Sequence, residues 1–388
     1  MNNLLKKLYH AIMLDWIFPW HYFRFSQVAI KKNKVVFIET QEQGLSNSLA
    51  YLYRELERQG GYHLCVRHLD EAESGKVKYV LNALGCLVEI ATANYVILSE
   101  ASRVISCISP RQETKVLQLW HACGAFKRFG LSTAKLQFGG DYKENEKYPY
   151  YKNLDLVTVS SPEVAWAYSE AMNILLESNI IQAMGISRTD VFFDEDFKAT
   201  AKKRIEAILP VEDKRKWLLW APTFRGDTNA AIAPEYPDLF AMKAALGDDY
   251  ILLIKHHPFV QNRPGVPVDV QDFAFDVSDS CDISDLICSC DMCISDYSSI
   301  VFEYSLMERP MIFFATDKED YEDWRGFYYP YEEMTPGPVV TNTKDLIEAI
   351  KEMTNNFDAS EIVAFREKFM SACDGKATER IISYLQLG

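Results

Sequence analysis

Short apolar runs alternate along this chain with stretches of helical periodicity. The run KVVFIET at 34–40 is followed by SNSLAYLYRELERQG at 46–60, in which apolar residues recur three and four positions apart. Such alternation predicts parallel β-strands connected by helices. Further strands of this first series are predicted at HLCVRHL (63–69), RVISCIS (103–109), KVLQLWH (115–121), LVTVS (156–160) and IIQAMG (180–185).

A second series of apolar runs follows a mostly helical join at 188–209. It comprises KWLLWAP (216–222), YILLIKHHP (250–258), DFAFDV (272–277), DMCISD (291–296) and PMIFFA (310–315), separated by helices such as Ile300–Glu308. Two such series predict an α/β fold of two Rossmann-like domains that face each other across a cleft. We expect these domains at residues 28–195 and 196–388, after an N-terminal segment at 1–27.

The segment 1–27 has the pattern of an amphipathic helix. Its predicted apolar face consists of Leu4, Leu5, Leu8, Ile12, Met13 and Trp16, and Lys6, Lys7 and His10 lie off that face. A break is predicted at Pro19, after which come Trp20, Tyr22, Phe23, Arg24 and Phe25. Basic and aromatic residues together suit a helix that lies on an anionic membrane surface. The alternative is a helix that packs on its own domain or in a dimer.

Composition narrows the class of protein. The 388 residues exceed one ordinary core, and 48% hydrophobic with 25% charged residues is typical of a folded globular protein. A net charge of −14 argues against general nucleic-acid binding, which requires a basic surface. No apolar run reaches the roughly 18 to 20 residues that span a bilayer. Nine cysteines without a secretory signal indicate a reducing cytoplasm.

Two short clusters raise the question of a metal. Cys288, Cys290 and Cys293 lack a second ligand pair at zinc spacing and fit a buried strand, where cysteine packs as a small hydrophobe. The acidic cluster at 194–196 resembles the DxD metal motif of some glycosyltransferases, but an acidic helix start explains it more simply. We therefore expect neither a metal nor another cofactor.

Polar residues follow four of the predicted strands. In parallel sheets, ligands bind beyond the carboxyl ends of the strands, so residues at these ends are candidates for a site. His121 follows KVLQLW, and His257 follows YILLIK. The other candidates are Thr223 and Arg225 after WLLWAP, and Asp296, Ser298 and Ser299 after DMCIS.

The candidates of the second series suit a phosphorylated ligand. Ser298 and Ser299 begin a predicted helix whose free N–H groups favour an anion, and Glu303, one turn later, can accept hydrogen bonds from ribose hydroxyls. The alternative is a plain serine cap with a solvated Glu303. The Arg225 fork matches phosphate, with a surface salt bridge as the alternative.

Strand alternation separates the three residues of KHH. Lys255 and His257 point to the same face, and both can contact phosphoryl oxygens there. His256 points to the opposite face and is interpreted as structural.

His121 precedes a loop of small residues, which are Ala122, Cys123, Gly124 and Ala125. Small residues allow backbone N–H groups to approach a ligand closely, and an imidazole can take up a proton near neutral pH. A base on one domain opposite phosphate-binding residues on the other predicts group transfer from a nucleotide diphosphate to a hydroxyl.

Several longer motifs resemble one known family. They are QLWHACGAFKRFG, MGISRTD, APTFRG, KHHP, CISDYSSIVFEYSLMERPMIFF and YEDWRGFYYPYEEMTPGPVV. In these motifs, and in their order, the chain is similar to the CDP-glycerol glycerophosphotransferases, the teichoic-acid primases and polymerases of bacterial walls and capsules. The resemblance implies a GT-B fold, no metal required by that fold, and peripheral attachment to the cytoplasmic face of the cell membrane.

The resemblance also implies a reaction. Glycerol phosphate or ribitol phosphate would pass from CDP-glycerol or CDP-ribitol to a hydroxyl of a polyprenyl-diphosphate-linked saccharide, with release of CMP. The implied donor contacts are His121 to Ala125, Arg188, Thr223, Lys255 to His257, Ser298, Ser299 and Glu303, and we add Arg225 and Asp296 from the strand ends. We expect His121 to deprotonate the acceptor and His257 to stabilise charge on the pyrophosphate and CMP, with the reverse assignment open.

Two departures from the family pattern leave the identity of the alditol open. The family loop commonly has Gly-Thr-Pro where this chain has Ala122, Cys123 and Gly124, and arginine is commoner at the position of Lys255. Primase and polymerase, and wall polymer and capsule, are likewise both open, as is a homo-oligomer or a complex of wall-polymer enzymes. Two further alternatives are a GT-B transferase of CMP-sugars, such as a sialyltransferase, and a non-catalytic subunit that docks a polymerase at the membrane.

Overall fold

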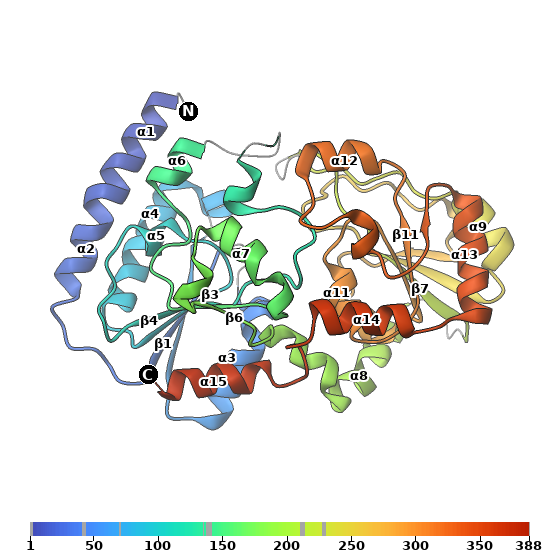
Figure 1. Cartoon of the computed structure of the whole chain (residues 1–388). Coiled ribbons are helices and arrows are strands. Elements are labelled where there is room, and N and C mark those ends of the chain that lie inside the picture. The colour runs from blue at the N-terminus through green and yellow to red at the C-terminus, as the bar shows by residue number, and fades with distance from the viewer. Residues whose placement is uncertain are drawn as a thin grey trace.

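The computed structural model describes residues 3–40, 44–69, 71–134, 136, 142–209, 214–226 and 230–387. Two parallel six-stranded sheets organise these residues, with strand orders β2-β1-β3-β4-β5-β6 and β12-β11-β10-β7-β8-β9. Helices cover the faces of both sheets, and the two lobes lie side by side in Figure 1. The predicted α/β class with two parallel sheets is confirmed. We call the elements around the first sheet the first lobe and those around the second sheet the second lobe.

The first sheet consists of β1 (Lys34–Glu39), β2 (His63–His68), β3 (Tyr95–Leu98), β4 (Lys115–Gln118), β5 (Leu156–Thr158) and β6 (Ile181–Gln182). Its helices are α3 (Asn47–Gln59), α4 (Glu71–Ala91, broken at Gly75), α5 (Arg103–Ser106), α6 (Tyr142–Lys147) and α7 (Ala165–Met172). Short 3₁₀ segments complete it: η2 (Gly130–Thr133), η3 (Pro162–Val164), η4 (Leu176–Ser178) and η5 (Ser187–Phe193).

One predicted strand of the first lobe is wrong. Residues 103–109 begin with helix α5, and the strand next to β1 is instead β3, Tyr95–Leu98. Every residue of β3 is buried, as expected for a central parallel strand. The error arises because both segments are short apolar runs, and periodicity alone does not separate a buried strand from a buried helical turn.

The second sheet consists of β7 (Lys216–Trp220), β8 (Tyr250–Ile254), β9 (Ala274–Asp276), β10 (Met292–Ser295), β11 (Met311–Phe314) and β12 (Val339–Val340). Around it lie α8 (Glu195–Glu206), α9 (Leu239–Leu246), α10 (Ile283–Ser289), α11 (Ile300–Ser305), α12 (Lys318–Arg325), α13 (Thr343–Asn356) and α14 (Ser360–Phe369), with 3₁₀ segments η7 (Val268–Val270) and η8 (Tyr331–Met334). All five strands predicted for this lobe are present, and β8, β10 and β11 are buried at every residue, as their plain apolar runs predict.

The two clusters for which a metal was considered have structural roles. Cys288, Cys290 and Cys293 are buried free thiols. Asp194 caps α8, since its Oδ1 accepts a hydrogen bond of 3.0 Å from the backbone N–H of Phe197. Among the described residues, no group of three or more His, Cys, Asp or Glu side chains is arranged to hold a metal ion.

The N-terminal helices pack along the first lobe. Helix α1 (Asn3–Ile12), a π-helical segment η1 (Met13–Ile17) and α2 (Phe18–Phe25) follow one another without interruption beside α4 (Figure 1). The predicted break at Pro19 is therefore wrong. A π-helical turn widens the helix just before the proline, which lacks an N–H and would otherwise press on the preceding turn.

In the structure, the apolar residues of this segment are divided between a buried face and an exposed face. Met13, Leu14, Phe18 and Tyr22 are buried in the core of the first lobe. Leu8, Ile12, Trp16, Trp20 and Phe23 are exposed, with Trp16 at 75% and Phe23 at 65%. The side chains of Leu4, Leu5 and Lys6 are not among those that the structure describes. Packing and an exposed apolar face, which the sequence offers as alternatives, thus occur together. No helix in the described residues is long and apolar enough to cross a membrane.

The end of the chain returns to the first lobe. Helix α15 (Ala377–Leu387) places Ile381, Ile382 and Leu385 in a core cluster with residues of β1 and β3, and Tyr95 Oη donates a hydrogen bond to Leu385 O. Figure 1 shows this helix beside α3. Residues 377–387, expected in the second domain, therefore cover the first sheet.

Candidate active site

The carboxyl ends of β3 and β4 bring two side chains together. The strands are parallel neighbours with Leu98 opposite Gln118, so the residues that follow them leave the sheet at the same edge. At that edge His121 Nδ1 lies 2.8 Å from Glu100 Oε1. The His121 side chain is 42% exposed and so remains accessible to a reactant. Glu100 was not predicted for the site, because strand β3, which ends two residues before it, was not predicted and a strand was placed at 103–109 instead.

Trp120 sets the direction in which His121 leaves the strand. Its φ of +65° is uncommon for a residue with a large side chain and costs about 1 to 3 kcal/mol. The buried indole offsets this cost by packing on Phe129, with ring centroids 5.0 Å apart, and on Tyr168 at 6.1 Å. Strain at this position turns the chain sharply and holds the His121 ring 4.5 Å from the indole.

The loop of small residues serves the contact between the lobes. Gly124 has φ +62°, and a Cβ there would lie 2.3 Å from the ring of Phe302 on α11. Its N–H donates to Ser160 Oγ at 3.0 Å, so that group is not directed at a ligand. Cys123 and Ala125 are also buried, whereas Ala122 is half-buried. The expected close approach is therefore made by α11 of the second lobe.

A backbone clasp continues this contact. Arg128 N donates to Gly326 O at 3.1 Å, and Tyr328 N donates to Phe126 O at 3.2 Å. Lys127 and Phe327 are thereby paired as in an antiparallel bridge. The segment RGFYY of the second lobe thus extends the His121 loop of the first.

Two cations at this clasp, Lys127 and Arg325, lie close enough to His257 to lower its pKa. Burial first, then the charges of Arg325 and Arg225, lower the pKa of Lys127 to about 7. Burial also lowers the pKa of Arg325. Neither residue was predicted for the site, because their positions depend on a contact between segments about two hundred residues apart.

His257 experiences positive charge from both lobes. Burial first, then the charges of Lys127, Arg325 and His121, lower its pKa to about 4, so the ring is neutral near pH 7. Its Nδ1 accepts a hydrogen bond of 3.2 Å from the N–H of Phe259, which places the proton of the neutral ring on Nε2. His257 is thus a neutral donor beside two cations, Lys127 and Arg325, and we define these three residues as the cationic cluster.

The other two residues of KHH support the loop. Lys255 Nζ donates to the carbonyls of Ser278 and Cys281, both at 2.7 Å. Burial lowers its pKa. His256 is buried, and its Nε2 lies 3.1 Å from Tyr236 Oη, as expected for a structural role.

Arg225 is engaged by carboxylates. Its Nε is 2.6 Å from Asp317 Oδ2, its Nη2 is 3.0 Å from Asp296 Oδ2, and its Nη1 donates to Thr223 O at 2.7 Å. Asp296 also accepts hydrogen bonds from the N–H groups of Thr223 and Tyr297. In this arrangement Arg225 and Asp296 hold the ends of β7 and β10 together, so the guanidinium fork predicted for phosphate is occupied.

Three hydroxyl groups remain at these strand ends. The Oγ1 of Thr223 is buried and has no hydrogen-bond partner among the described residues. Ser299 is the N-cap of α11 but makes no side-chain cap hydrogen bond. Within the described residues, the one hydrogen bond of Ser298 Oγ is a long one of 3.4 Å, accepted from Ile300 N. The simple serine cap therefore accounts for little of this motif.

Arg188 and Glu303 join the two lobes. Arg188 of η5 donates from Nε to Glu303 Oε1 at 2.5 Å, and Glu303 is almost fully buried on α11. The charge of Glu303 raises the pKa of Arg188 against the opposing effect of burial. Both residues were predicted for the site, and the structure places them in contact with each other.

Comparison with solved structures identifies the fold class. A structure of the wall teichoic acid polymerase TagF matches 100% of this chain and 97% of its own, with a TM-score of 0.77 at 22% identity. The fold is therefore that α/β architecture of two parallel sheets.

Sequence comparison then identifies the family. The profile of the CDP-glycerol:poly(glycerophosphate) glycerophosphotransferases matches residues 20–387, and the chain belongs to this family of transferases. It is 33% identical over 360 residues to a teichoic acid ribitol-phosphate primase of Bacillus spizizenii, covering 92% of this chain and 91% of that one. It is 34% identical to a teichoic acid poly(ribitol-phosphate) polymerase of the same organism, covering 99% of this chain and 60% of the polymerase.

Proposed function

We propose that this chain transfers an alditol phosphate from CDP-glycerol or CDP-ribitol to a hydroxyl of a polyprenyl-diphosphate-linked acceptor and releases CMP. The lobes would act as the two Rossmann-like domains of a GT-B enzyme. The first would approach the acceptor, and the second would hold the donor. The carrying observation is that Lys127 of the first lobe and Arg325 of the second, next to each other's segments at the clasp, both place positive charge near His257.

The cationic cluster suits a diphosphate. Lys127, Arg325 and the Nε2–H of His257 can donate to phosphoryl oxygens and stabilise the charge that develops as CMP departs. The unpaired Thr223 Oγ1 and the uncommitted hydroxyls of Ser298 and Ser299 supply further donors on the nucleotide side.

His121 is the proposed base. Its Nδ1 faces Glu100, so a neutral ring that carries its proton on Nδ1 presents Nε2 to the acceptor hydroxyl. The hydroxyl proton passes to Nε2, and the oxygen attacks the phosphorus that bears the alditol. The bond from that phosphorus to the bridging oxygen breaks, and CMP leaves with the electron pair. Glu100 then stabilises the imidazolium.

The exposed face of the N-terminal helices supports attachment to the membrane. Leu8, Ile12, Trp16, Trp20 and Phe23 form it, and we name it the apolar stripe. Aromatic side chains at this density suit the interface of a bilayer, with the opposite face of the helices fixed on the protein. We infer that the enzyme lies on the cytoplasmic face of the cell membrane, where CDP-linked donors are available.

The direct test is product analysis. Purified protein is incubated with a lipid-linked disaccharide, with and without one added alditol phosphate, and with CDP-glycerol, CDP-ribitol or a CMP-sugar. CMP release and a product heavier by one alditol phosphate support the proposal and identify the alditol. Turnover only with the CMP-sugar would favour the glycosyltransferase. No turnover, together with a tight complex with a partner polymerase, would favour the docking subunit.

A further inference from the structure

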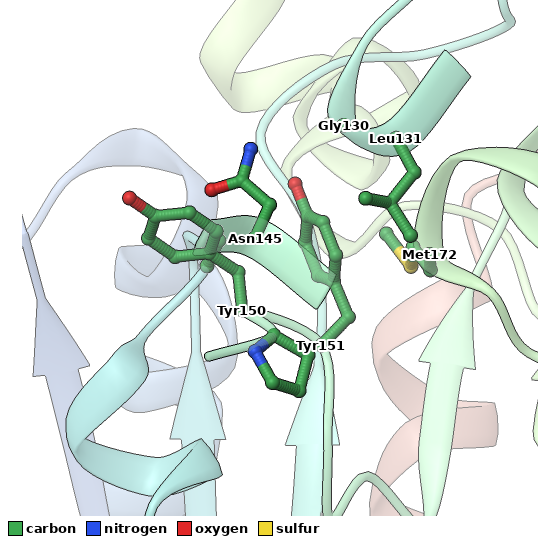
Figure 2. A pocket seen from close by; sticks show the side chains of 8 residues that line it. Gly130, Leu131, Asn145, Tyr150, Tyr151 and Met172 are labelled. Carbon is green, nitrogen blue, oxygen red and sulfur yellow. The ribbon is translucent and has the colours of Figure 1, made fainter. Parts of the chain in front are cut away.

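A cavity of about 230 Å³ lies in the first lobe beside the proposed base. Its walls are Ala101, Gly130, Leu131, Asn145, Pro149, Tyr150, Tyr151 and Met172. Figure 2 shows the rings of Tyr150 and Tyr151, the amide of Asn145, and Leu131 with Met172 around it. The cavity is smaller than the roughly 300 to 1,000 Å³ of sites for drug-sized ligands, so it fits one small unit of a longer molecule.

The cavity adjoins the Glu100–His121 pair. Ala101 follows Glu100 directly, and the ring of Tyr151 lies 6.1 Å from that of Trp120, which precedes His121. Burial first, and then the charge of Glu100, raise the pKa of Tyr151. A ligand in the cavity is therefore close to the residues that position the base.

The walls combine aromatic faces with a fixed polar edge. The guanidinium of Arg103 lies 4.1 Å from the ring centroid of Tyr150, and its Nη2 donates to Asn145 Oδ1 at 2.9 Å. Arg103 thereby holds both Tyr150 and Asn145 in place. Aromatic rings pack on the C–H faces of sugars and polyols, and an amide edge hydrogen-bonds their hydroxyls.

The same walls are tied to the N-terminal helices. Tyr148, directly before Pro149, donates from Oη to Asp15 Oδ2 at 2.9 Å, and Glu144 Oε1 of α6 lies 2.5 Å from His10 Nδ1. Helix α6 lies next to α1 in Figure 1. The segments that wall the cavity thus contact both the strand end before His121 and the helices that carry the apolar stripe.

We propose that this cavity binds the polyhydroxylated terminal unit of the acceptor, a sugar ring or an alditol residue, and that Tyr150 and Tyr151 determine its fit. The inference rests on the proposed transferase function. A prenyl chain is the less suitable occupant, because it would cover the Asn145 amide without a hydrogen bond. Acceptors that end in a sugar and acceptors that end in an alditol phosphate distinguish the two sources of this chemistry.

The test alters the cavity with two variants, one on each side. Tyr150→Ala deletes an aromatic face, and Leu131→Trp fills the space from η2. The acceptor KM should rise about three- to tenfold in the first variant, as expected for one lost aromatic contact, and at least tenfold in the second. The donor KM should stay within about twofold in both. Tyr150→Phe keeps the ring, so its KM should rise less than that of Tyr150→Ala. Phe240→Ala, which truncates an exposed aromatic residue of the second lobe, is the control that should retain the wild-type KM.

The acceptors separate the alternatives. Each variant, its fold checked by thermal unfolding, is assayed with the same terminal unit on a short alkyl chain and on a long prenyl chain. Binding of the short-chain acceptor without donor is measured by calorimetry. Equal fold-changes on both chains support the proposal. An effect confined to the prenyl acceptor, or unchanged KM and binding in either folded variant, would overturn it. A wild-type protein without CMP release would instead refute the proposed function and the cavity assignment with it.

Discussion

Glu100 Oε1 and His121 Nδ1 lie 2.8 Å apart, on loops that leave two adjacent strands of the first sheet. A carboxylate on one imidazole nitrogen fixes the ring and favours the tautomer in which the other nitrogen accepts a proton. This relationship gives Glu100 a positioning role that is separable from binding of the donor.

Glu100→Gln should lower kcat by about 10²-fold or more, because an amide does not stabilise the imidazolium that forms during proton transfer. Donor affinity, measured by calorimetry, should change less than threefold. Glu100→Asp should recover part of the activity. Wild-type kcat in a folded Glu100→Gln variant would contradict the role.

The two histidines should fail in different ways. His121→Ala should reduce turnover about 10²- to 10⁴-fold with donor affinity within a few-fold of wild type, as for loss of a positioned base. His257→Ala should weaken donor binding as well, since the variant loses the Nε2–H donor that lies beside Lys127 and Arg325. His63→Ala, at the exposed start of β2, is the control. Loss of donor affinity in His121→Ala would reverse the assignment.

Lys127 should make donor binding depend on pH. Its pKa of about 7 in the free protein means that it is largely neutral at pH 9, and the phosphates of the donor favour its charged form. Donor binding should therefore weaken at least about tenfold from pH 7 to pH 9 and be accompanied by proton uptake. His257, with a pKa of about 4, stays neutral throughout this range.

Lys127→Arg keeps the charge at every pH and should remove most of this dependence. Calorimetry in two buffers of different ionisation enthalpy measures the proton uptake directly. An identical slope in the wild type and in Lys127→Arg would assign the titration to another group.

Gly124→Ala should destabilise the protein by at least about 2 kcal/mol, because a Cβ at φ +62° would lie 2.3 Å from the Phe302 ring. Gly85→Ala, in an open position of α4, should instead stabilise by about 0.5 to 1 kcal/mol. Urea unfolding measures both variants. Equal free energies of unfolding for Gly124→Ala and the wild type would show that the lobes separate there without cost.

The apolar stripe should carry membrane binding. Replacing Trp16, Trp20 and Phe23 with Ser should weaken sedimentation with anionic vesicles about tenfold or more, because each loses an apolar contact with lipid. Activity on a short-chain acceptor should remain. Phe240→Ser with Val268→Ser, two exposed apolar residues of the second lobe, is the matched control. Unchanged sedimentation of the triple variant would refute the stripe as an anchor.

The sequence predicted the second sheet better than the first. Its strands are apolar runs bounded by Pro, Asp or charged residues, whereas Tyr95–Leu98 follows helix α4 after only three residues. Since the strand was predicted in the wrong place, Glu100 was not recognised as a strand-end residue. His121 was predicted because it directly ends an apolar run, and His257 because it lies between the strand YILLI and Pro258.

Other site features depend on contacts that no local pattern encodes. The fork of Arg225 fits a carboxylate as well as a phosphate, and its partner Asp317 lies 92 residues away. Lys127 and Arg325 come together only through the clasp. The small residues of the His121 loop indicated a close approach, but Phe302 makes that approach.

The return of α15 to the first sheet gives the molecule a second covalent crossing. The chain passes to the second lobe between η5 and α8 and comes back between α14 and α15. Two chain crossings restrict the motion of one lobe relative to the other largely to rotation about the line that joins the crossings. Any opening that admits a nucleotide would then be a rotation about one axis, and it would have to break the backbone hydrogen bonds of the clasp at Lys127 and Phe327.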